Sequence, residues 1–415
     1  MKSVAKYAFF TFFITVVQYY NYSIFFISTK DLVANFFDSK DKFSSDVQFF
    51  TIFALSIFFR PLGSLVVAFI GDKFGRIYSL LIATILHSVS SLIIILIPTY
   101  SEIGFLSSVL ILFSRILLVI GIASETDGAR IYITDIIDKK YENLANGMIS
   151  SSTQIGVFLA FLLSYFAEVN HINFRILFFI GFFMGLLVIL IRIFDIISKN
   201  QHEKKINTQK LTIDLIRFEY KQNLGIFLKF IVLLGCIGGI YHFQIIFLSA
   251  YIQKFLDIKT NVKLLYITSI VLLIFTYPLA GFIADKFNSQ KFQLKISLFI
   301  FILCSICNMI LAANKSFNYF LFFLSVVSIP FFACIIQVRV KNKISSLYRQ
   351  SIFTLNHSIG SSLFSSTTPL IAVYIMNYTG EFYLSYAYVI MLSVLILYFS
   401  RVIVNNVKIS QQNKI

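Results

Sequence analysis

Two short stretches of the chain, AFIGDKFGR at residues 68–76 and GFIADKFN at residues 281–288, share an acid, a lysine and a phenylalanine in the same order. In each stretch the acid, Asp72 or Asp285, comes at the end of a run of apolar residues. The two stretches stand at equivalent points, after the second apolar run of each half of the chain. A motif repeated at equivalent positions predicts a structure built from two similar parts.

The composition excludes a water-soluble enzyme. Of the 415 residues 58% are hydrophobic and only 13% are charged, whereas a soluble domain carries about 25% charged residues. The net charge of +16 does not indicate a nucleic-acid partner, because the Lys and Arg residues lie mainly in short connectors between apolar runs. That distribution is typical of a multi-pass helical membrane protein.

The apolar runs predict an all-α protein with twelve transmembrane helices. Each run has about 20 residues, the length that a helix needs to cross the hydrocarbon core. The predicted spans are 7–28, 48–70, 77–97, 104–128, 145–167, 174–196, 224–248, 264–284, 294–313, 317–338, 350–376 and 382–404.

The longest polar interruption divides these spans into six and six. It covers residues 198–223 and contains six basic residues. We therefore predict an N-terminal six-helix bundle at 1–197, a cytoplasmic linker at 198–223 and a C-terminal six-helix bundle at 224–415, the two bundles being pseudo-symmetric.

The basic residues also predict the orientation of the chain. Connectors on the side of the N-terminus hold about three times as many Lys and Arg residues as connectors on the other side, which places both termini in the cytoplasm. The first apolar run, at about 7–27, is too long for the apolar region of a signal peptide and is predicted to be a membrane helix.

The first repeat resembles the signature of the major facilitator superfamily, a glycine four residues before an acid that is followed by basic residues and a second glycine; Ala68 stands at the first glycine here. Asp72, Lys73, Gly75 and Arg76 match that signature. Together with the sequence RPLG at 60–63, they resemble more closely the metabolite:proton symporter family, which includes proline/betaine, α-ketoglutarate, citrate and shikimate transporters.

Three further stretches support this resemblance, RILLVIGIASETDGA at 115–129, FRI at 174–176 and SSTTPL at 365–370. The resemblance implies the major facilitator fold and a secondary active transporter that works by alternating access. It further implies import of a small polar or zwitterionic metabolite or osmolyte, similar to proline, betaine or an organic acid, together with protons.

The first predicted span departs from the family pattern. It reads QYYNY at 18–22, where the family has Glu-Trp-Tyr-Asp-Phe, so both carboxylates are replaced by neutral amides. We therefore expect Glu125 in the fourth span to carry the proton, with Asp127, which stands where the family has glycine, as another candidate. The departure leaves two alternatives open, a uniporter or exchanger of the same fold and a membrane receptor that does not transport.

The candidate pathway residues are polar or charged side chains on otherwise apolar helices. Because a charge at mid-bilayer costs about 2.5–3.5 kcal/mol on insertion scales, such groups are expected to face a cavity or to be paired. Arg115 and Glu125 are ten residues apart, about 15 Å along a helix, so they are not expected to pair with each other. The predicted substrate and proton pathway comprises Gln18, Tyr19, Asn21, Arg115, Glu125, Asp127, Gln154 and Asn356.

The repeated motif predicts a second kind of site, an ion-pair latch that holds the transporter in one conformation and breaks as the bundles rock. The alternative is a solvated positive-inside anchor. The predicted latch comprises Arg60, Asp72, Lys73, Gly75, Arg76, Asp285 and Lys286.

No motif for catalysis or cofactor binding occurs in the sequence. It lacks the phosphate-binding GxxxxGK[ST], the HExxH and the GxSxG patterns, and the pair Cys304 and Cys307 has no second pair or histidine cluster to complete a metal site. We predict a monomeric transporter, not an enzyme, in a bacterial inner membrane. Its partners would be a small solute, protons and the lipid bilayer, with no cofactor, metal or nucleic acid; the solute and the direction of transport stay open.

Overall fold

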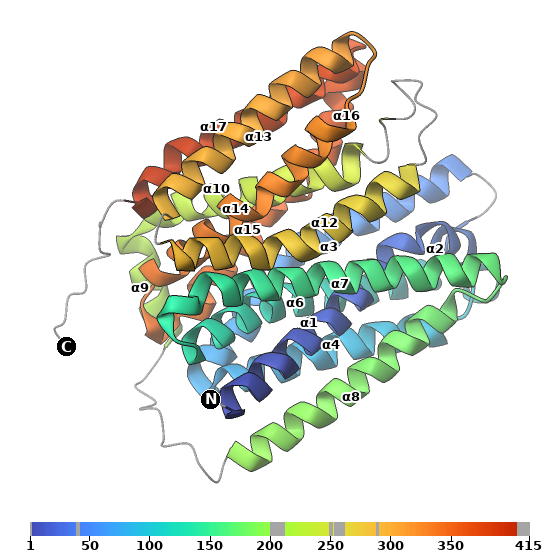
Figure 1. Cartoon of the computed structure of the whole chain (residues 1–415). Helices are drawn as coiled ribbons and strands as arrows, with labels where there is room; N and C mark the ends of the chain where they lie inside the picture. The colour runs from blue at the N-terminus through green and yellow to red at the C-terminus, as the bar shows by residue number, and fades with distance from the viewer. Residues whose placement is uncertain are drawn as a thin grey trace. The chain divides into compact units, whose positions relative to one another are not determined.

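The computed structural model describes most of the chain, and the described residues form helices with no strand among them (Figure 1). The described ranges are 2–38, 42–199, 212–248, 252, 262–287 and 290–404.

Long helices alternate with short connecting ones. Two of the membrane helices contain one turn of wider π-helix, at His242–Phe247 and Ser361–Ser365. The helices are α1 (Lys2–Ile27), α2 (Thr29–Phe36), α3 (Lys42–Phe74), α4 (Arg76–Leu96), α5 (Tyr100–Ile103), α6 (Phe105–Ile136), α7 (Glu142–Val169), α8 (Arg175–Lys199), α9 (Ile213–Gln222), α10 (Leu224–Tyr241), α12 (Val262–Lys286), α13 (Gln290–Ala313), α14 (Tyr319–Lys343), α15 (Arg349–Gly360), α16 (Thr368–Thr379) and α17 (Ser385–Val404).

Eleven helices in the described part of the chain are long and apolar enough to cross a membrane. They coincide with eleven of the twelve predicted spans. The remaining predicted span, 48–70, lies in α3, which is helical over 33 residues but is not among the eleven. Its segment 57–74 contains three charged residues, Arg60, Asp72 and Lys73, whereas each of the eleven helices has an apolar stretch of 18 residues with at most two.

The chain divides into two compact units. The first comprises Met1–Ile133 and Ser152–Thr212, and the second comprises Thr134–Ser151 and Ile213–Ile415. The connector between α6 and α7 and the first residues of α7 thus group with the second unit, although they precede the predicted linker.

In the first unit α1, α4 and α8 pack against one another (Figure 1). Gly156 of α7 lets α1 approach closely, since a Cβ atom there would clash with the Val16 carbonyl oxygen and with Tyr19. Gly181 of α8 does the same opposite Asn21. Helices that associate in lipid use small residues in this way because close backbone approach increases van der Waals contact.

The turn between α3 and α4 depends on Gly75, which has a φ of 116°. A residue with a side chain is strained in that conformation, so glycine is the residue that suits the turn. Part of the signature predicted as a latch is therefore a structural requirement for reversing the chain.

Arg175, from the FRI stretch of the family resemblance, joins the ends of two helices. Its guanidinium donates to the carbonyl oxygens of Ile95 (3.0 Å) and Ile97 (2.7 Å) at the end of α4 and lies over the ring of Phe36 at 5.4 Å. The last carbonyls of a helix have no partner within the helix, and a cation there also interacts favourably with the helix dipole. Arg175 therefore stabilises the junction of α2, α4 and α8.

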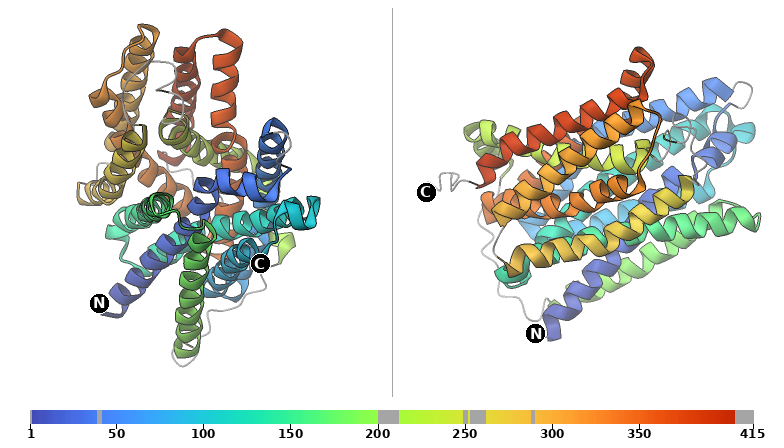
Figure 2. Two further views of the ribbon diagram at one scale, coloured as in Figure 1. Left: turned by 90° about the vertical axis from the view of Figure 1, so that its right-hand side faces the viewer. Right: turned by 45° about the horizontal axis from the view of Figure 1, so that its top comes forward.

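In the second unit α13 packs along α14 and α17, and α12 along α14 (Figure 2). A tight crossing joins α10 and α15, where Gly235 and Gly360 face each other. A Cβ atom on Gly360 would meet the Ile231 carbonyl oxygen and the Gly235 backbone. The crossing brings the backbones of these two membrane helices into direct contact.

We predict that Arg175→Ala lowers the thermal stability of the purified protein. The variant loses two hydrogen bonds from a charged donor, each contributing about 1.5–3 kcal/mol. A thermal melt in detergent measures the effect. Arg401→Ala, at an exposed position near the end of α17, is the matched control, and equal melting temperatures for the two variants would contradict the role assigned to Arg175.

Candidate functional site

A buried ion pair lies at the centre of the first unit. Glu125 of α6 is fully buried, and its carboxylate accepts a hydrogen bond from the guanidinium of Arg192 on α8, which is 3% exposed. The Thr84 hydroxyl of α4 lies 3.4 Å from both carboxylate oxygens. Three membrane helices thus meet at one carboxyl group.

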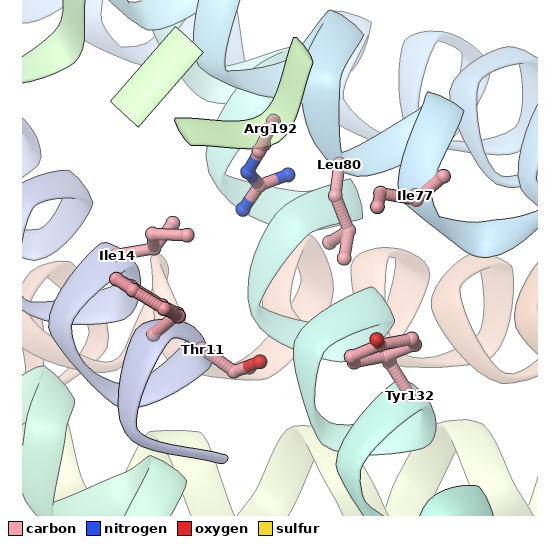
Figure 3. A pocket seen from close by; sticks show the side chains of 7 residues that line it. Thr11, Ile14, Ile77, Leu80, Tyr132 and Arg192 are labelled. Atoms are coloured by element: carbon pink, nitrogen blue, oxygen red, sulfur yellow. The ribbon is translucent and has the colours of Figure 1, made fainter. Parts of the chain in front are cut away.

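A small cavity adjoins this pair on the Arg192 side (Figure 3). Its volume is about 20 Å³, which is enough for a water molecule. Figure 3 shows Arg192, Leu80 and Thr11 pointing into the same space. The cavity is lined by Phe10, Thr11, Ile14, Ile77, Leu80, Tyr132 and Arg192.

The position of this cavity along the helices is informative. Thr11 and Leu80 lie near the starts of α1 and α4, whereas Tyr132 and Arg192 lie near the ends of α6 and α8. Because the predicted spans alternate in direction, these four helix ends share one side of the first unit. Glu125 lies seven residues before Tyr132, about 10 Å deeper, so Arg192 stands between the carboxylate and the cavity.

Arg115 lies apart from this pair, as expected from its spacing from Glu125. It is 1% exposed, and its guanidinium stacks over the rings of Tyr22 and Phe25, 5.0 and 4.7 Å from the centroids. The cation–π attraction helps to stabilise the charge away from water. Arg115 is thereby surrounded by aromatic rings of α1.

Asn21 and Gln18, the two amides that replace carboxylates, have different surroundings. The Asn21 amide donates to the Gly181 carbonyl oxygen (3.2 Å) and its oxygen accepts from Ser91 (3.5 Å). It therefore connects α1 to α8 and α4. Gln18 is 1% exposed, and neither polar atom of its side chain has a hydrogen-bond partner within the described residues.

Tyr19 belongs to a separate polar group. It shares a side-chain hydrogen bond with Thr126, and Arg60 and Arg130 are close enough to act on it electrostatically. Asp127 pairs with Arg130 at 3.3 Å, with both side chains almost fully buried. Arg60, which was predicted as a latch residue, is therefore near Tyr19; it lies twelve residues from Asp72, about 18 Å along α3.

The other two predicted pathway residues also have polar partners. The Gln154 amide of α7 lies 3.3 Å from the Thr153 hydroxyl in the first unit. In the second unit Asn356 is fully buried and accepts a hydrogen bond from the Tyr220 hydroxyl at 2.8 Å.

The first copy of the repeated motif forms contacts within itself. Asp72 pairs with Arg76 at 3.4 Å, across the turn between α3 and α4. The exposed Lys73 lies over the rings of Phe69 and Phe74, with its ammonium 5.5 and 5.4 Å from their centroids.

The second copy repeats the position of the lysine but not the pairing of the acid. Lys286 lies over the rings four residues before it and one residue after it, at 5.4 and 5.5 Å. Asp285 instead accepts hydrogen bonds from the start of α7, from the Asn143 side chain (2.7 Å) and the Leu144 backbone N–H (2.7 Å). A carboxylate at a helix N-terminus satisfies free N–H groups and interacts favourably with the dipole.

A network of charges that the sequence analysis missed surrounds the connector before α7, within the second unit. Lys341 of α14 is 2% exposed; it pairs with Glu142, donates to the Thr134 hydroxyl (3.0 Å) and lies 4.0 Å from Asp135. Arg349, at the start of α15, pairs with Asp135 at 2.8 Å.

Hydrogen bonds from two neutral amide side chains extend this network. Asn342 donates to Glu142 at 2.8 Å, and Asn146 donates to the Cys334 carbonyl oxygen and to Gln337, both at 3.1 Å. Glu142 and Asn342 lie beside polar connectors, where the sequence signal was interpreted only as orientation, whereas Asn146, Cys334 and Gln337 lie within predicted spans. Glu142 and Lys341 each stand next to an apolar run in the sequence, but only the folded chain shows that they pair.

Comparison with known proteins agrees with this architecture. A profile of the Major Facilitator Superfamily matches residues 9–342. The chain is 27% identical over 406 residues to a "Putative proline/betaine transporter" of Staphylococcus haemolyticus, covering 91% of this chain and 83% of the relative. It is 21% identical to a citrate-proton symporter of Salmonella typhi, covering 88% and 86%.

Solved structures of the same superfamily share the fold. The proton:xylose symporter XylE superimposes with a TM-score of 0.75 at 14% identity, covering 98% of this chain and 97% of that one. The transporter FucP, solved in an outward conformation, gives a TM-score of 0.69 at 11% identity and covers 97% and 98%. With a family profile that spans most of its length and relatives that align along nearly all of it, this chain belongs to the Major Facilitator Superfamily and is a membrane transporter rather than an enzyme.

Proposed function

We propose that this transporter imports a small carboxylated solute, such as proline, betaine or an organic acid, together with protons. The observation that carries the proposal is the buried pair of Glu125 and Arg192. A charged pair inside apolar helices is costly to keep there, and ionisable groups within membrane spans commonly mark proton or ion pathways.

The pair suggests how proton movement and conformational change are coupled. While Arg192 holds the Glu125 carboxylate, both charges are satisfied. If α8 moves Arg192 away, the carboxylate is left in an apolar site, where a carboxyl group is neutralised by a proton rather than remaining charged. The cavity beside Arg192 then offers a water-sized step toward the cytoplasmic side.

The solute class follows from Arg115 and from the relatives. Proline, betaine and citrate all carry a carboxylate, which arginine recognises well. Tyr22 and Phe25, which now stack on Arg115, could receive a quaternary ammonium group through cation–π attraction. The names of the relatives, "Putative proline/betaine transporter" and "Citrate-proton symporter", refer to solutes of this chemistry.

The proposal includes a membrane topology. When α3 is counted with the eleven candidate spans, twelve helices form two six-helix bundles joined by the linker at 198–223. Both termini then lie in the cytoplasm of a bacterial cell. Asp285 and the network around Lys341 act as the latch, because they hold the start of α7 against α12 and α14, and the end of α6 against α15. Opening toward the cytoplasm would have to break these contacts.

An exchanger or uniporter of the same fold is the second candidate. It is favoured by Gln18 and Asn21, which cannot take up a proton in the first span, and by the hydrogen bond that commits Asn21 to helix packing.

We predict that Glu125→Gln abolishes concentrative uptake but keeps exchange. A potential of 100 mV supplies about 2.3 kcal/mol per charge, enough for about a 50-fold gradient of a neutral solute that moves with one proton. Proteoliposomes given radiolabelled proline, betaine or citrate, with and without an uncoupler, measure the first activity, and counterflow measures the second.

Glu381→Gln, at an exposed position, is the matched control. The double variant Glu125→Gln/Arg192→Gln removes both charges, so it separates loss of coupling from misfolding caused by an unpaired arginine. Uncoupler-sensitive accumulation by Glu125→Gln would assign the proton to another group. Uptake that ignores the uncoupler in the unmodified protein would favour the exchanger.

We predict that Lys341→Gln opens the cytoplasmic side more often. Removing one member of a buried ion pair costs about 3–5 kcal/mol, and Glu142 loses its charged partner. Ser151→Cys is a suitable reporter, because Ser151 is 6% exposed and donates to the Ile274 carbonyl oxygen of α12 at 2.6 Å. A maleimide that cannot cross the membrane should label this cysteine faster in inside-out vesicles when Lys341 is changed.

Lys139→Gln serves as the control, since Lys139 is exposed in the same connector. Asp285→Asn should accelerate labelling as well, although less, because the side chain keeps an oxygen that accepts from α7. Identical labelling rates in all four proteins would show that these contacts do not limit opening.

A further inference from the structure

The short helix α9 (Ile213–Gln222) lies in the predicted linker and had no assigned role. One side of it is fixed to the second unit. Ile216 is 6% exposed, and the Tyr220 ring lies 5.0 Å from the ring of Phe227 on α10. The Tyr220 hydroxyl donates to Asn356 of α15, and burial raises its pKa to about 12, so it stays a neutral donor.

The rest of α9 carries large apolar side chains that are exposed, although the segment lies outside the predicted spans. Ile213, Leu215 and Phe218 are 66%, 42% and 58% exposed. Arg217 and Lys221 are exposed too, as is Asp214 in the first turn, whereas the half-buried Glu219 accepts a hydrogen bond from the Asn223 side chain at 2.9 Å. At 100° per residue, Leu215 and Phe218 share one flank of the helix, and the two basic residues share the adjacent flank.

This exposed surface continues into a membrane helix. Only Asn223 separates α9 from α10, and it accepts hydrogen bonds from the Ile226 and Phe227 N–H groups at the start of α10. Leu224 and Leu228, in the first turns of α10, are 47% and 51% exposed. Since α10 is a candidate span, its exposed leucines are expected to face lipid. The end of α9 therefore lies next to the point where this apolar surface of α10 starts.

A helix with this pattern suits the boundary between lipid headgroups and acyl chains better than water. There its large apolar side chains are buried, while its basic side chains extend to the phosphates. The basic residues also favour an anionic leaflet over a zwitterionic one. A membrane with anionic headgroups therefore satisfies both flanks of α9 at once.

We propose that α9 is an interfacial helix that docks on anionic lipid, with Leu215 and Phe218 inserted among the upper acyl carbons and Arg217 and Lys221 on the headgroup phosphates. The docked helix presents Tyr220 to Asn356, next to the π-helical turn of the same membrane span. The proposal requires α10 to enter the membrane near Leu224 and does not depend on the transported solute.

The chain has no tryptophan, so Phe218→Trp introduces a single fluorescent reporter. The full-length variant is placed in nanodiscs of phosphatidylcholine with or without phosphatidylglycerol, and acyl-chain-brominated lipids serve as quenchers. We expect blue-shifted emission that bromolipid quenches and aqueous iodide does not, with stronger quenching when phosphatidylglycerol is present.

Two further variants make the result decisive. Leu228→Trp reports an embedded position and should be quenched by bromolipid in both membranes. Adding Arg217→Gln and Lys221→Gln to the Phe218→Trp protein should weaken the dependence on phosphatidylglycerol, because each basic side chain shifts docking about fivefold. Red-shifted, iodide-sensitive emission of Phe218→Trp would overturn the proposal. Bromolipid quenching that is the same with and without phosphatidylglycerol, and the same with and without the two basic residues, would overturn it as well.

Discussion

Glu125 carries a carboxylate into a bundle of apolar helices, and the guanidinium of Arg192 makes that position tolerable. An unpaired charge at this depth would be costly, so α6 and α8 must stay in register as long as the carboxyl is ionised. Thr84 adds a contact from α4. The pair therefore constrains three membrane helices and gives the first unit a group whose charge state can alter their packing.

The other buried charges of the first unit follow the same requirement with different partners. Asp127 pairs with Arg130 one turn away, whereas Arg115 rests on aromatic rings. Each charged side chain thus has a local environment of its own. In the proposed cycle this separation allows the proton and the solute to act on different helices.

The two copies of the repeated motif show how similar sequences take different roles. Lys73 and Lys286 lie over rings at equivalent positions, four residues before and one residue after, at nearly equal distances. These contacts are the same because they form within a single helix end. The acids differ, because the first copy has Arg76 four residues after Asp72, while the second copy has a serine at that place. Without a local arginine, Asp285 accepts hydrogen bonds from the start of α7 instead.

The sequence by itself determined the helical class, the approximate places of eleven of the twelve predicted spans and the superfamily, since these depend on apolar length and on short motifs that are local in the chain. It also singled out Glu125 and Asp285, because a charge in or beside an apolar run stands out without any knowledge of its neighbours. Only the tertiary structure showed that Glu125 pairs with Arg192, that Arg60 lies near Tyr19, and that Thr134–Ser151 group with the second unit. The energy of an ion pair depends on the distance between its members in space. Glu125 and Arg192 are 67 positions apart in the sequence, and Glu142 and Lys341 are 199 apart. The members of each pair become neighbours only when their helices pack.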